Sequence, residues 1–244
     1  GLYDYCTHCG ACVRACPNGG QHCTACGRCI RACPQGLRKL CGKRYTAQEL
    51  AQKLLRDKDY LAAMSGGVTF SGGEPLLQMD FVSEVFRLAH AKKVQTALDT
   101  SAQPFAPDNA EWMARFDRLL ENTDLVILDL KEIDDEKHKK LTGHSNKNIL
   151  AMAQYVAARG VDLWVRHVLV PGLTDDADGL RALDAFIKTL PTVRRVEILP
   201  YHTLGVGKYA ALGRPYSLNG VSDMDKARCA ALEVKWFQPW NRRG

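Results

Sequence analysis

The chain has 244 residues, of which 46% are hydrophobic and 25% charged, a balance that fits one large core, or one domain with a small appendage. No stretch approaches the roughly 18 uninterrupted apolar residues of a membrane span, and no basic-then-apolar leader opens the sequence. The composition therefore argues against a membrane protein and predicts a cytoplasmic location.

The net charge of +6 is concentrated near the start of the sequence. Residues 1–44 carry seven Lys and Arg side chains against one acidic residue, Asp4, whereas the other 200 residues carry 26 basic and 26 acidic side chains. A basic segment can indicate nucleic-acid binding, but this one lacks interleaved aromatic residues and is crowded with cysteines. We therefore expect no nucleic-acid partner, and we interpret the charge as an offset to bound anionic groups.

Eight of the ten cysteines lie between residues 6 and 33, in two copies of C-x2-C-x2-C-x3-C-P. Disulfides would need an oxidising compartment, which nothing here indicates. Zinc sites favour C-x2-C pairs separated by a dozen or more residues. Three cysteines at x2 spacing, then a fourth after x3 and a proline, are instead the bacterial ferredoxin run for [4Fe–4S] clusters. We predict a small ferredoxin-type module over residues 1–42.

Each run supplies three ligands to one cluster and its last cysteine to the other, because three close cysteines wrap three corners of a cubane. The predicted sets are Cys6, Cys9, Cys12 and Cys33 for the first cluster, and Cys23, Cys26, Cys29 and Cys16 for the second. Each loaded cluster would carry a charge of about −2. Cys41 and Cys229 lie outside both runs, and we expect buried, inert thiols.

Residues 43–244 alternate β-rich and helical segments. Thr46 and Glu49 form a capping box that opens a helix to about Leu61. We predict strands at Val68–Phe70, Val94–Leu98, Leu125–Leu128, Leu163–Val170 and Val196–Leu199, and helices near 79–91, 110–121, 147–159 and 177–190. This alternation is typical of βαβ units and predicts an α/β fold with a parallel sheet.

Glycine or polar residues follow four of the predicted strands and lie within the fourth, Leu163–Val170, and the carboxyl ends of parallel strands share one rim. They are Gly72, Gly73 and Glu74, then Asp99, then Asp129, Leu130 and Lys131, then Arg166 and His167, and finally His202. Asp and Gly also turn chains, and a lone His is often structural, but five such sites in succession predict a binding site. Glu74 and Asp99 can accept from an ammonium group and Lys131 can pair with a carboxylate, which suits a zwitterionic ligand.

Five segments resemble the glycyl radical enzyme activating enzymes, radical S-adenosylmethionine (SAM) proteins similar to pyruvate formate-lyase activase. The segments are VTFSGGEPLLQ, DTS, LVILDLKEIDDEKHKKLTGHSNKNIL, WVRHVLVPGLTDD and VEILPYHTLGVGKYAALG, within about Tyr45 to Leu218. The resemblance implies a partial (β/α)6 barrel over residues 43–244, its first strand missing here, with SAM at a third [4Fe–4S] cluster. The two-cluster insert resembles the branch whose partners are diol, choline and hydroxyproline lyases or dehydratases.

The resemblance also implies the chemistry. An electron cleaves SAM to methionine and a 5′-deoxyadenosyl radical, which takes hydrogen from a glycine of the partner enzyme under anaerobic conditions, and a flavodoxin or ferredoxin-type reductant supplies the electron. No side chain is implied as acid or base. By position, Gly72, Gly73, Glu74 and Asp99 would meet the methionyl amino group, Asp129, Leu130 and Lys131 the methionyl end, and Arg166 and His202 the ribose and adenine.

Two departures qualify this resemblance. The family's SAM cluster uses a C-x3-C-x2-C motif just before the insert, and these 244 residues contain none. We expect that motif in a missing N-terminus; the chain as given cannot hold the catalytic cluster. Ala102 stands where the family usually has glycine after DTS, and the tail WFQPWNRRG differs from the usual ending. The alternative is an electron-transfer polyferredoxin fused to a non-catalytic barrel, with a zinc ribbon as a more distant one.

Overall fold

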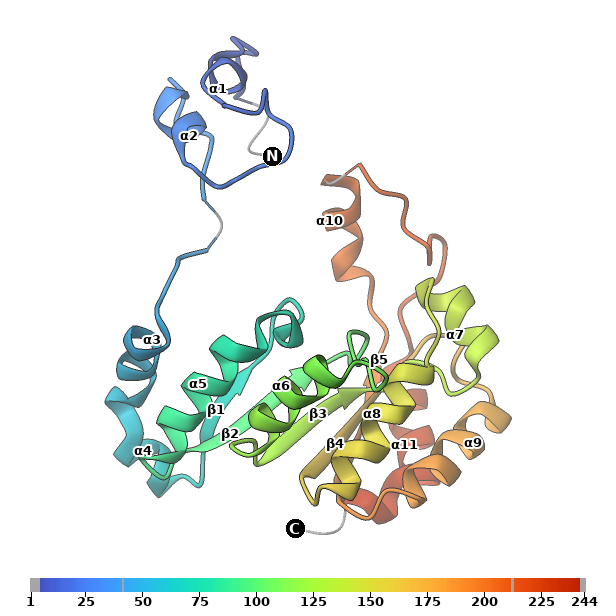
Figure 1. The fold of residues 1–244 in the computed structure, drawn as a ribbon. Helices are drawn as coiled ribbons and strands as arrows, with labels where there is room; N and C mark the ends of the chain where they lie inside the picture. The colour runs from blue at the N-terminus through green and yellow to red at the C-terminus, as the bar shows by residue number, and fades with distance from the viewer. Residues whose placement is uncertain (1–4, 41, 212, 242–244) are drawn as a thin grey trace. The chain divides into compact units, whose positions relative to one another are not determined.

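The computed structural model describes residues 5–40, 42–211 and 213–241, with the side chain of residue 211 left aside. The chain divides into two compact units, Gly1–Thr46 and Ala47–Gly244, which are described separately. The first unit contains two short helices, α1 (Ala11–Arg14) and α2 (Arg28–Ala32), joined by turns (Figure 1). Cys41, predicted to be a buried thiol, lies outside the described residues.

The second unit is built on a parallel sheet of five strands, β1 (Gly67–Phe70), β2 (Gln95–Thr100), β3 (Leu125–Asp129), β4 (Asp162–Leu169) and β5 (Val193–Pro200). The strands lie side by side in chain order. Because the parallel strands are adjacent in chain order, every crossover from one strand to the next runs in the same direction. The connecting helices therefore cover one face of the sheet, and the sheet curls as in a barrel. The predicted α/β fold with five parallel strands is confirmed.

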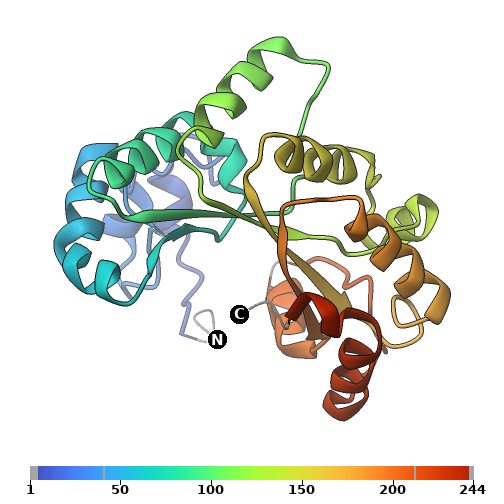
Figure 2. The same cartoon turned by 90° about the horizontal axis from the view of Figure 1, so that it is seen from below.

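The connecting helices are α5 (Met79–His90), α6 (Ala110–Leu120), α8 (Lys147–Ala158) and α9 (Ala177–Lys188), all at predicted positions. Figure 2 shows them around the outside of the curved sheet. The helix predicted from Thr46 to Leu61 is interrupted: α3 (Ala47–Leu54) passes through a 3-10 turn, η1 (Leu55–Asp57), into α4 (Lys58–Ala63). A 3-10 helix η2 (Pro75–Gln78) precedes α5.

Three further helices were not predicted. They are α7 (Asp135–Thr142), α10 (Val206–Ala211), which follows the 3-10 turn η3 (Thr203–Gly205), and α11 (Lys226–Asn241). Helix α7 buries a single residue, His138, so it has no apolar stripe to reveal it. Helix α11 contains Pro239, a residue that normally argues against a helix interior.

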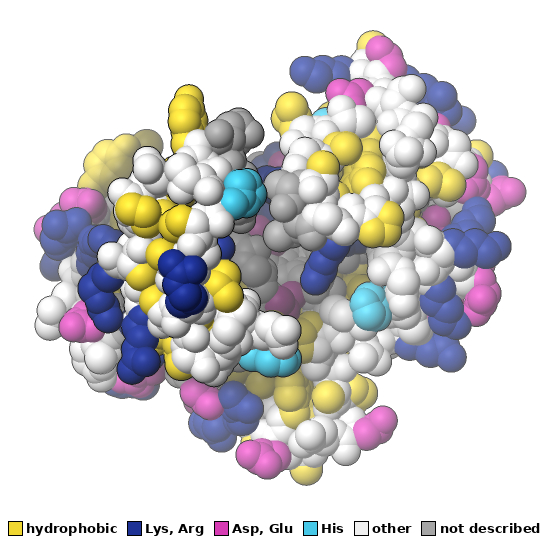
Figure 3. Space-filling model, turned by 90° about the horizontal axis from the view of Figure 1, so that it is seen from above, with side chains coloured by type: hydrophobic (Ala, Val, Ile, Leu, Met, Phe, Trp, Pro, Cys, Tyr) yellow, Lys and Arg dark blue, Asp and Glu magenta, His cyan; other side chains and the backbone are white. Residues whose placement is uncertain are grey.

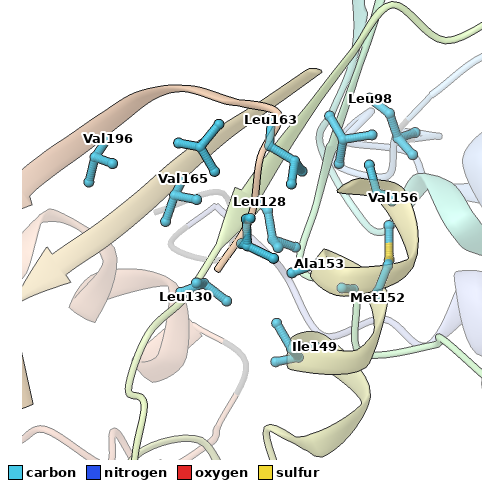
Figure 4. Packing of buried hydrophobic residues seen from close by; sticks show 14 of the residues in the cluster. Leu98, Leu128, Leu130, Ile149, Met152, Ala153, Val156, Leu163, Val165 and Val196 are labelled. Carbon is cyan, nitrogen blue, oxygen red and sulfur yellow. The ribbon is translucent and has the colours of Figure 1, made fainter. Parts of the chain in front are cut away.

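The core lies between the sheet and the helical layer. Leu128, Leu163 and Val165 are fully buried, and Met152 and Val156 of α8 pack against them (Figure 4). Burying a leucine side chain contributes about 1.5–3 kcal/mol, so this layer is a main source of the unit's stability.

Cys229 on α11 is 4% exposed, and burial raises the pKa of its thiol. The expectation of a buried thiol at this position is therefore confirmed.

Strand β4 sets the direction of the rim side chains. Its residues alternate between buried and half-buried along their whole length. Leu163 and Val165 face the helices, so Trp164 and Arg166, which alternate with them, face the opposite, concave side of the sheet. Within the part of the chain that the structure describes, no helix is both long enough and apolar enough to span a bilayer.

Candidate functional site

The two cysteine runs adopt the same local conformation. Each leads into a short helix through a left-handed glycine, Gly10 with φ 70° and Gly27 with φ 73°. Two residues before each glycine, His8 and Ala25 also have positive φ, of 52° and 53°. Positive φ is costly for a residue with a Cβ, so its recurrence at matching positions marks one loop shape used twice. The repeated sequence is therefore a repeated structure.

Four cysteines line one cavity in the first unit. Cys6, Cys9 and Cys12 of the first run and Cys33 of the second border a space of about 570 Å³. The structure thus brings together the four residues that the spacing assigns to the first cluster. A liquid water molecule occupies about 30 Å³, so the cavity has room for a group much larger than one ion.

This cavity differs from a site for a single metal ion. Among the described residues, no three His, Cys, Asp or Glu side chains lie close enough together to hold one ion. Zinc needs every sulfur at about 2.3 Å from one point. A cubane instead binds each thiolate at a different corner, so its ligands stand further apart. Four cysteines around one cavity are able to bind a group at different corners.

The second predicted ligand set consists of Cys16, Cys23, Cys26 and Cys29, which are half-buried or exposed. The backbone N–H of Ala25 donates to Sγ of Cys23 at 3.4 Å. Since backbone amides around the sulfurs are typical of iron–sulfur sites, this contact suits a ligating cysteine.

Backbone amides also favour the thiolate of one cysteine in each set. The N–H of Arg28 lowers the pKa of the Cys26 thiol, and N–H groups led by that of Leu37 lower the pKa of the Cys33 thiol. The thiolate is the form that binds metal, so both shifts favour the metal-binding form of the sulfur.

In the second unit, the carboxyl-terminal halves of β2, β4 and β5 bring together three charged side chains, which we call the rim triad: Asp99, Arg166 and Glu197. Arg166 donates through Nη1 to Oδ2 of Asp99 at 2.8 Å and through Nε to Oε2 of Glu197 at 3.1 Å. Because Asp99 lies on β2 and Glu197 on β5, the guanidinium links strands that are not neighbours. Burial alone would lower the pKa of Arg166, but the two carboxylates outweigh it and raise that pKa.

The strand β3 ends beside this triad. Nζ of Lys131 lies 3.0 Å from Oδ2 of Asp129, and both side chains are part-exposed. Leu130 between them is 2% exposed, and its backbone N–H donates to the carbonyl of Arg166 at 2.8 Å. Its carbonyl lies 2.7 Å from Nδ1 of His167. Leu130 therefore supports the rim through its backbone, while the flanking side chains of Asp129 and Lys131 stay part-exposed.

Glu74 connects the loops after β1 and β2. One carboxylate oxygen accepts from the N–H of Leu76 at 3.1 Å and from Oγ1 of Thr100 at 2.6 Å. The other accepts from the N–H and Oγ of Ser101, at 3.0 and 2.6 Å. Two donors on each oxygen occupy the usual acceptor positions of a carboxylate. The side chain thus fixes the loops rather than offering a free acceptor.

Glycines next to Glu74 leave the rim open. Gly72 has φ 106°, a conformation that favours glycine, and a Cβ placed on Gly72 or Gly73 would meet nothing within 4 Å. The open space leaves the backbone accessible to a ligand.

Ala102, where the resemblance expects glycine, has φ 57° and is fully buried. The left-handed backbone explains the family's glycine, and an alanine there bears a strain of about 1–2 kcal/mol.

Two histidines near the rim differ in placement. His167, predicted among the rim residues, is 3% exposed, with Nδ1 on the carbonyl of Leu130 and Nε2 3.3 Å from that of Thr174. Burial lowers the pKa of His167. The residue lies on the helix-facing side of β4 rather than on the concave side. His202 is exposed where η3 begins, and among the described contacts it makes no hydrogen bond to the rim triad.

Glu197 is the rim residue that sequence reasoning missed. It pairs in register with Arg166 across β4 and β5, and Asp129 pairs with Arg166 across β3 and β4. A signal was available in VEILPYH, where Glu197 is the one charged residue of the predicted strand Val196–Leu199. Only the register shows that it lies at the depth of Arg166.

Known proteins resemble both the sequence and the fold. The model of the Radical SAM superfamily matches residues 6–182. A pyruvate formate-lyase-activating enzyme of Streptococcus mutans is 49% identical over 202 residues, 81% of this chain and 76% of that protein. The corresponding enzyme of Clostridium pasteurianum is 41% identical over 192 residues, 79% of this chain and 77% of that protein. The chain belongs to the glycyl radical enzyme activating enzymes of the radical SAM superfamily.

Solved structures place this activating enzyme in the same fold. A domain of a pyruvate-formate lyase-activating enzyme from Bacteroides vulgatus superposes with a TM-score of 0.56 at 22% identity, over 72% of this chain and 95% of that chain. SuiB of Streptococcus suis, bound to S-adenosylmethionine, gives 0.58 at 17% identity, over 84% of this chain and 43% of SuiB. At these identities the likeness shows the fold alone, a radical SAM α/β fold.

Proposed function

We propose that this activating enzyme installs a glycyl radical in a partner enzyme, by taking hydrogen from one glycine of that partner. The 49% identity to a pyruvate formate-lyase-activating enzyme over 81% of the chain carries the proposal. A [4Fe–4S] cluster with bound SAM supplies the electron transfer and the 5′-deoxyadenosyl radical. That cluster needs a C-x3-C-x2-C motif, which these 244 residues lack, so catalysis is tested on the natural full-length protein.

The rim would hold the methionyl end of SAM. The open backbone at Gly72 and Gly73 can accept from the ammonium group, with the carboxylate of Asp99 nearby as a second acceptor. Because the acceptor positions of Glu74 are occupied by its own loops, we assign it a positioning role. Lys131 can pair with the carboxylate, at the cost of its contact with Asp129.

The remaining predicted residues keep the sites that the resemblance implies. Arg166 and His202 would flank the ribose and adenine, and Asp129 and Leu130 would line the methionyl end, Leu130 through the backbone that it fixes. Arg166 is half-buried, and its guanidinium is fixed by ion pairs with two carboxylates. A cation held in one position supports this assignment, because it can orient a bound ligand.

Residues 1–42 would form the two-cluster module. The cavity bordered by Cys6, Cys9, Cys12 and Cys33 supports the first cluster, and the repeated loop conformation supports a second on Cys23, Cys26, Cys29 and Cys16. Anaerobic reconstitution of the 244-residue chain should therefore give about eight iron and eight sulfide, and about twelve of each for the full-length protein. Iron near four, or stoichiometric zinc, would contradict this assignment.

The module would pass electrons from a cytoplasmic flavodoxin or ferredoxin-type reductant toward SAM. Cys23→Ser with Cys26→Ser should remove the second cluster and slow SAM cleavage when a protein supplies the electrons, but not when dithionite does. Full 5′-deoxyadenosine production by this variant with the protein reductant would show that the module does not relay electrons. An iron content lower by about four in the variant confirms that one cluster is lost.

The partner is tested directly. The relatives' name favours a pyruvate formate-lyase as the partner, whereas the cysteine runs led the sequence to predict the diol, choline or hydroxyproline branch. Reduced full-length protein with SAM is mixed with a representative of each class, and the glycyl radical is measured by electron paramagnetic resonance beside 5′-deoxyadenosine by chromatography. A glycyl radical signal on one of these candidate enzymes identifies that enzyme as the partner. SAM left intact throughout would favour the polyferredoxin alternative, which no finding supports.

A further inference from the structure

The two halves of the cysteine module are nearly identical but differ in one charge beside a ligand. A shift of 17 residues superimposes the runs, so Cys12 corresponds to Cys29 and Cys16 to Cys33. The segment after each Cys-Pro pair then aligns as Asn-Gly-Gly-Gln, residues 18–21, with Gln-Gly-Leu-Arg, residues 35–38. Arg38 therefore stands where the first half has the neutral Gln21.

Arg38 touches a predicted cluster ligand. Its Nη2 lies 3.6 Å from Sγ of Cys12, within hydrogen-bonding range for sulfur, and Arg38 borders the cavity that Cys6, Cys9 and Cys33 share with Cys12. Because Arg38 follows the second run and Cys12 lies in the first, the contact crosses between the halves. At the matching position, the backbone N–H of Gln21 donates to the carbonyl of Asn18 instead.

The matched arginines Arg14 and Arg31 lie near the backbone of their own loops. Arg14 and Arg31 are equivalent, and each folds back over the glycine of its own loop: a Cβ on Gly10 would lie 3.0 Å from Nη1 of Arg14, and one on Gly27 would lie 4.0 Å from Nη1 of Arg31. Arg14 also donates through Nη1 to the backbone carbonyl of Cys9 at 2.9 Å, whereas the described hydrogen bonds include no such bond of Arg31 and none from either side chain to a sulfur. Arg28, whose counterpart is Ala11, adds a charge that helps to lower the pKa of the Cys26 thiol, but the described hydrogen bonds include none from its side chain to a sulfur.

We propose that Arg38 makes the first cluster, on Cys6, Cys9, Cys12 and Cys33, the stronger electron acceptor of the pair. The inference rests on the proposed two-cluster module. Each cluster takes one electron, from the 2+ to the 1+ core, from a low-potential one-electron protein donor, and no covalent bond changes. A cationic N–H donor on a ligand sulfur stabilises the added negative charge, so it raises the reduction potential. The first electron that the module accepts then resides on the first cluster. Electron transfer between the two clusters therefore runs from the second to the first.

The test isolates one cluster at a time in the reconstituted 244-residue chain. Cys23→Ser with Cys26→Ser leaves the first cluster, and Cys6→Ser with Cys9→Ser leaves the second. In the first background, Arg38→Gln, which copies the other half, should change the ratio of reduced to oxidised cluster at least tenfold toward oxidised, about 59 mV for one electron. In the second background it should change nothing. The readout is a redox titration followed by electron paramagnetic resonance.

Controls separate the contact from general charge. Arg44→Gln removes the same charge from an exposed residue outside the cavity lining and should shift the titration much less. Gln21→Arg in the second-cluster background should shift that cluster toward reduced, a result that does not depend on how Arg38→Gln assembles. Equal potentials of the two isolated clusters, or equal effects of Arg38→Gln and Arg44→Gln, would overturn the inference. Iron well below eight in the unsubstituted chain would instead overturn the two-cluster proposal.

Discussion

The cysteine module and the barrel are stabilised in different ways. None of the described residues in 5–40 and 42–46 is buried, and α1 and α2 contribute no core. The barrel unit has a continuous apolar core with many fully buried side chains (Figure 4). Exposed basic side chains are drawn dark blue in Figure 3. A segment below about 40 residues without a core usually needs metals to fold, so we expect the clusters to hold the module and hydrophobic packing to hold the barrel.

Removal of iron should produce the largest difference in stability between the two units. Structural metal contributes on the order of 10 kcal/mol in zinc-finger peptides, far more than any single side chain. Chelation should therefore abolish amide protection in residues 5–40 while β2 to β5 keep theirs. Hydrogen exchange followed by mass spectrometry measures both in one sample. A protected module in the iron-free chain would show that it has a stability of its own.

The reverse experiment breaks the barrel. Leu128 is fully buried in the central strand, so Leu128→Ala should lower the free energy of unfolding by about 2–5 kcal/mol. Leu77→Ala, at a residue 73% exposed, serves as the matched control and should have little effect. Urea unfolding gives the stability, and iron content should be unchanged in both variants. Loss of iron in Leu128→Ala would mean that the module depends on the barrel's core.

A rim substitution should change binding without changing either unit. Lys131→Ala in the full-length protein removes the proposed partner of the SAM carboxylate and should weaken SAM binding by about 1.5–3 kcal/mol. Lys140→Ala, an exposed lysine on α7, is the control. Equilibrium titration measures affinity, while Tm and iron content should match those of the parent. Unchanged affinity would remove Lys131 from the site.

Acid should act on the barrel through His167. Its pKa is lowered by burial from an ordinary value of 6.5, so the unfolded chain binds this proton more readily than the folded one. Stability is complete above that value and falls as the pH decreases below it, by at most about 1.4 kcal/mol per pH unit. Unfolding curves of the chain and of His167→Asn between pH 7 and 5 check this. His8→Asn and His22→Asn, at exposed positions of the other unit, serve as controls.

The smallest effect concerns a left-handed residue. Ala102→Gly relieves about 1–2 kcal/mol of backbone strain. It also removes a buried methyl worth about 0.8 kcal/mol and adds flexibility to the unfolded chain. These contributions nearly cancel, so the free energy of unfolding should change by less than about 1 kcal/mol. A gain well above that would show that strain dominates even in a closely packed core, and chemical denaturation is sensitive enough to decide.

Periodicity and spacing determined much of this protein from the sequence alone. The five strands and four outer helices follow from local apolar patterns, which report which face of an element is buried. The ferredoxin spacing selected the four cysteines that the structure places around one cavity. The sequence did not predict helices α7 and α11, because α7 buries a single residue and α11 contains a proline. Their helical state depends on contacts with the rest of the fold.

Tertiary structure alone decided how the polar residues are used. Glu74 is occupied by Thr100 and Ser101, and Glu197 joins Asp99 through Arg166, because parallel strands from distant parts of the chain end at one rim. A carboxylate's partners depend on register and on which face of a strand it occupies. The sequence shows that these residues follow strands, and only the packed sheet shows which charges meet.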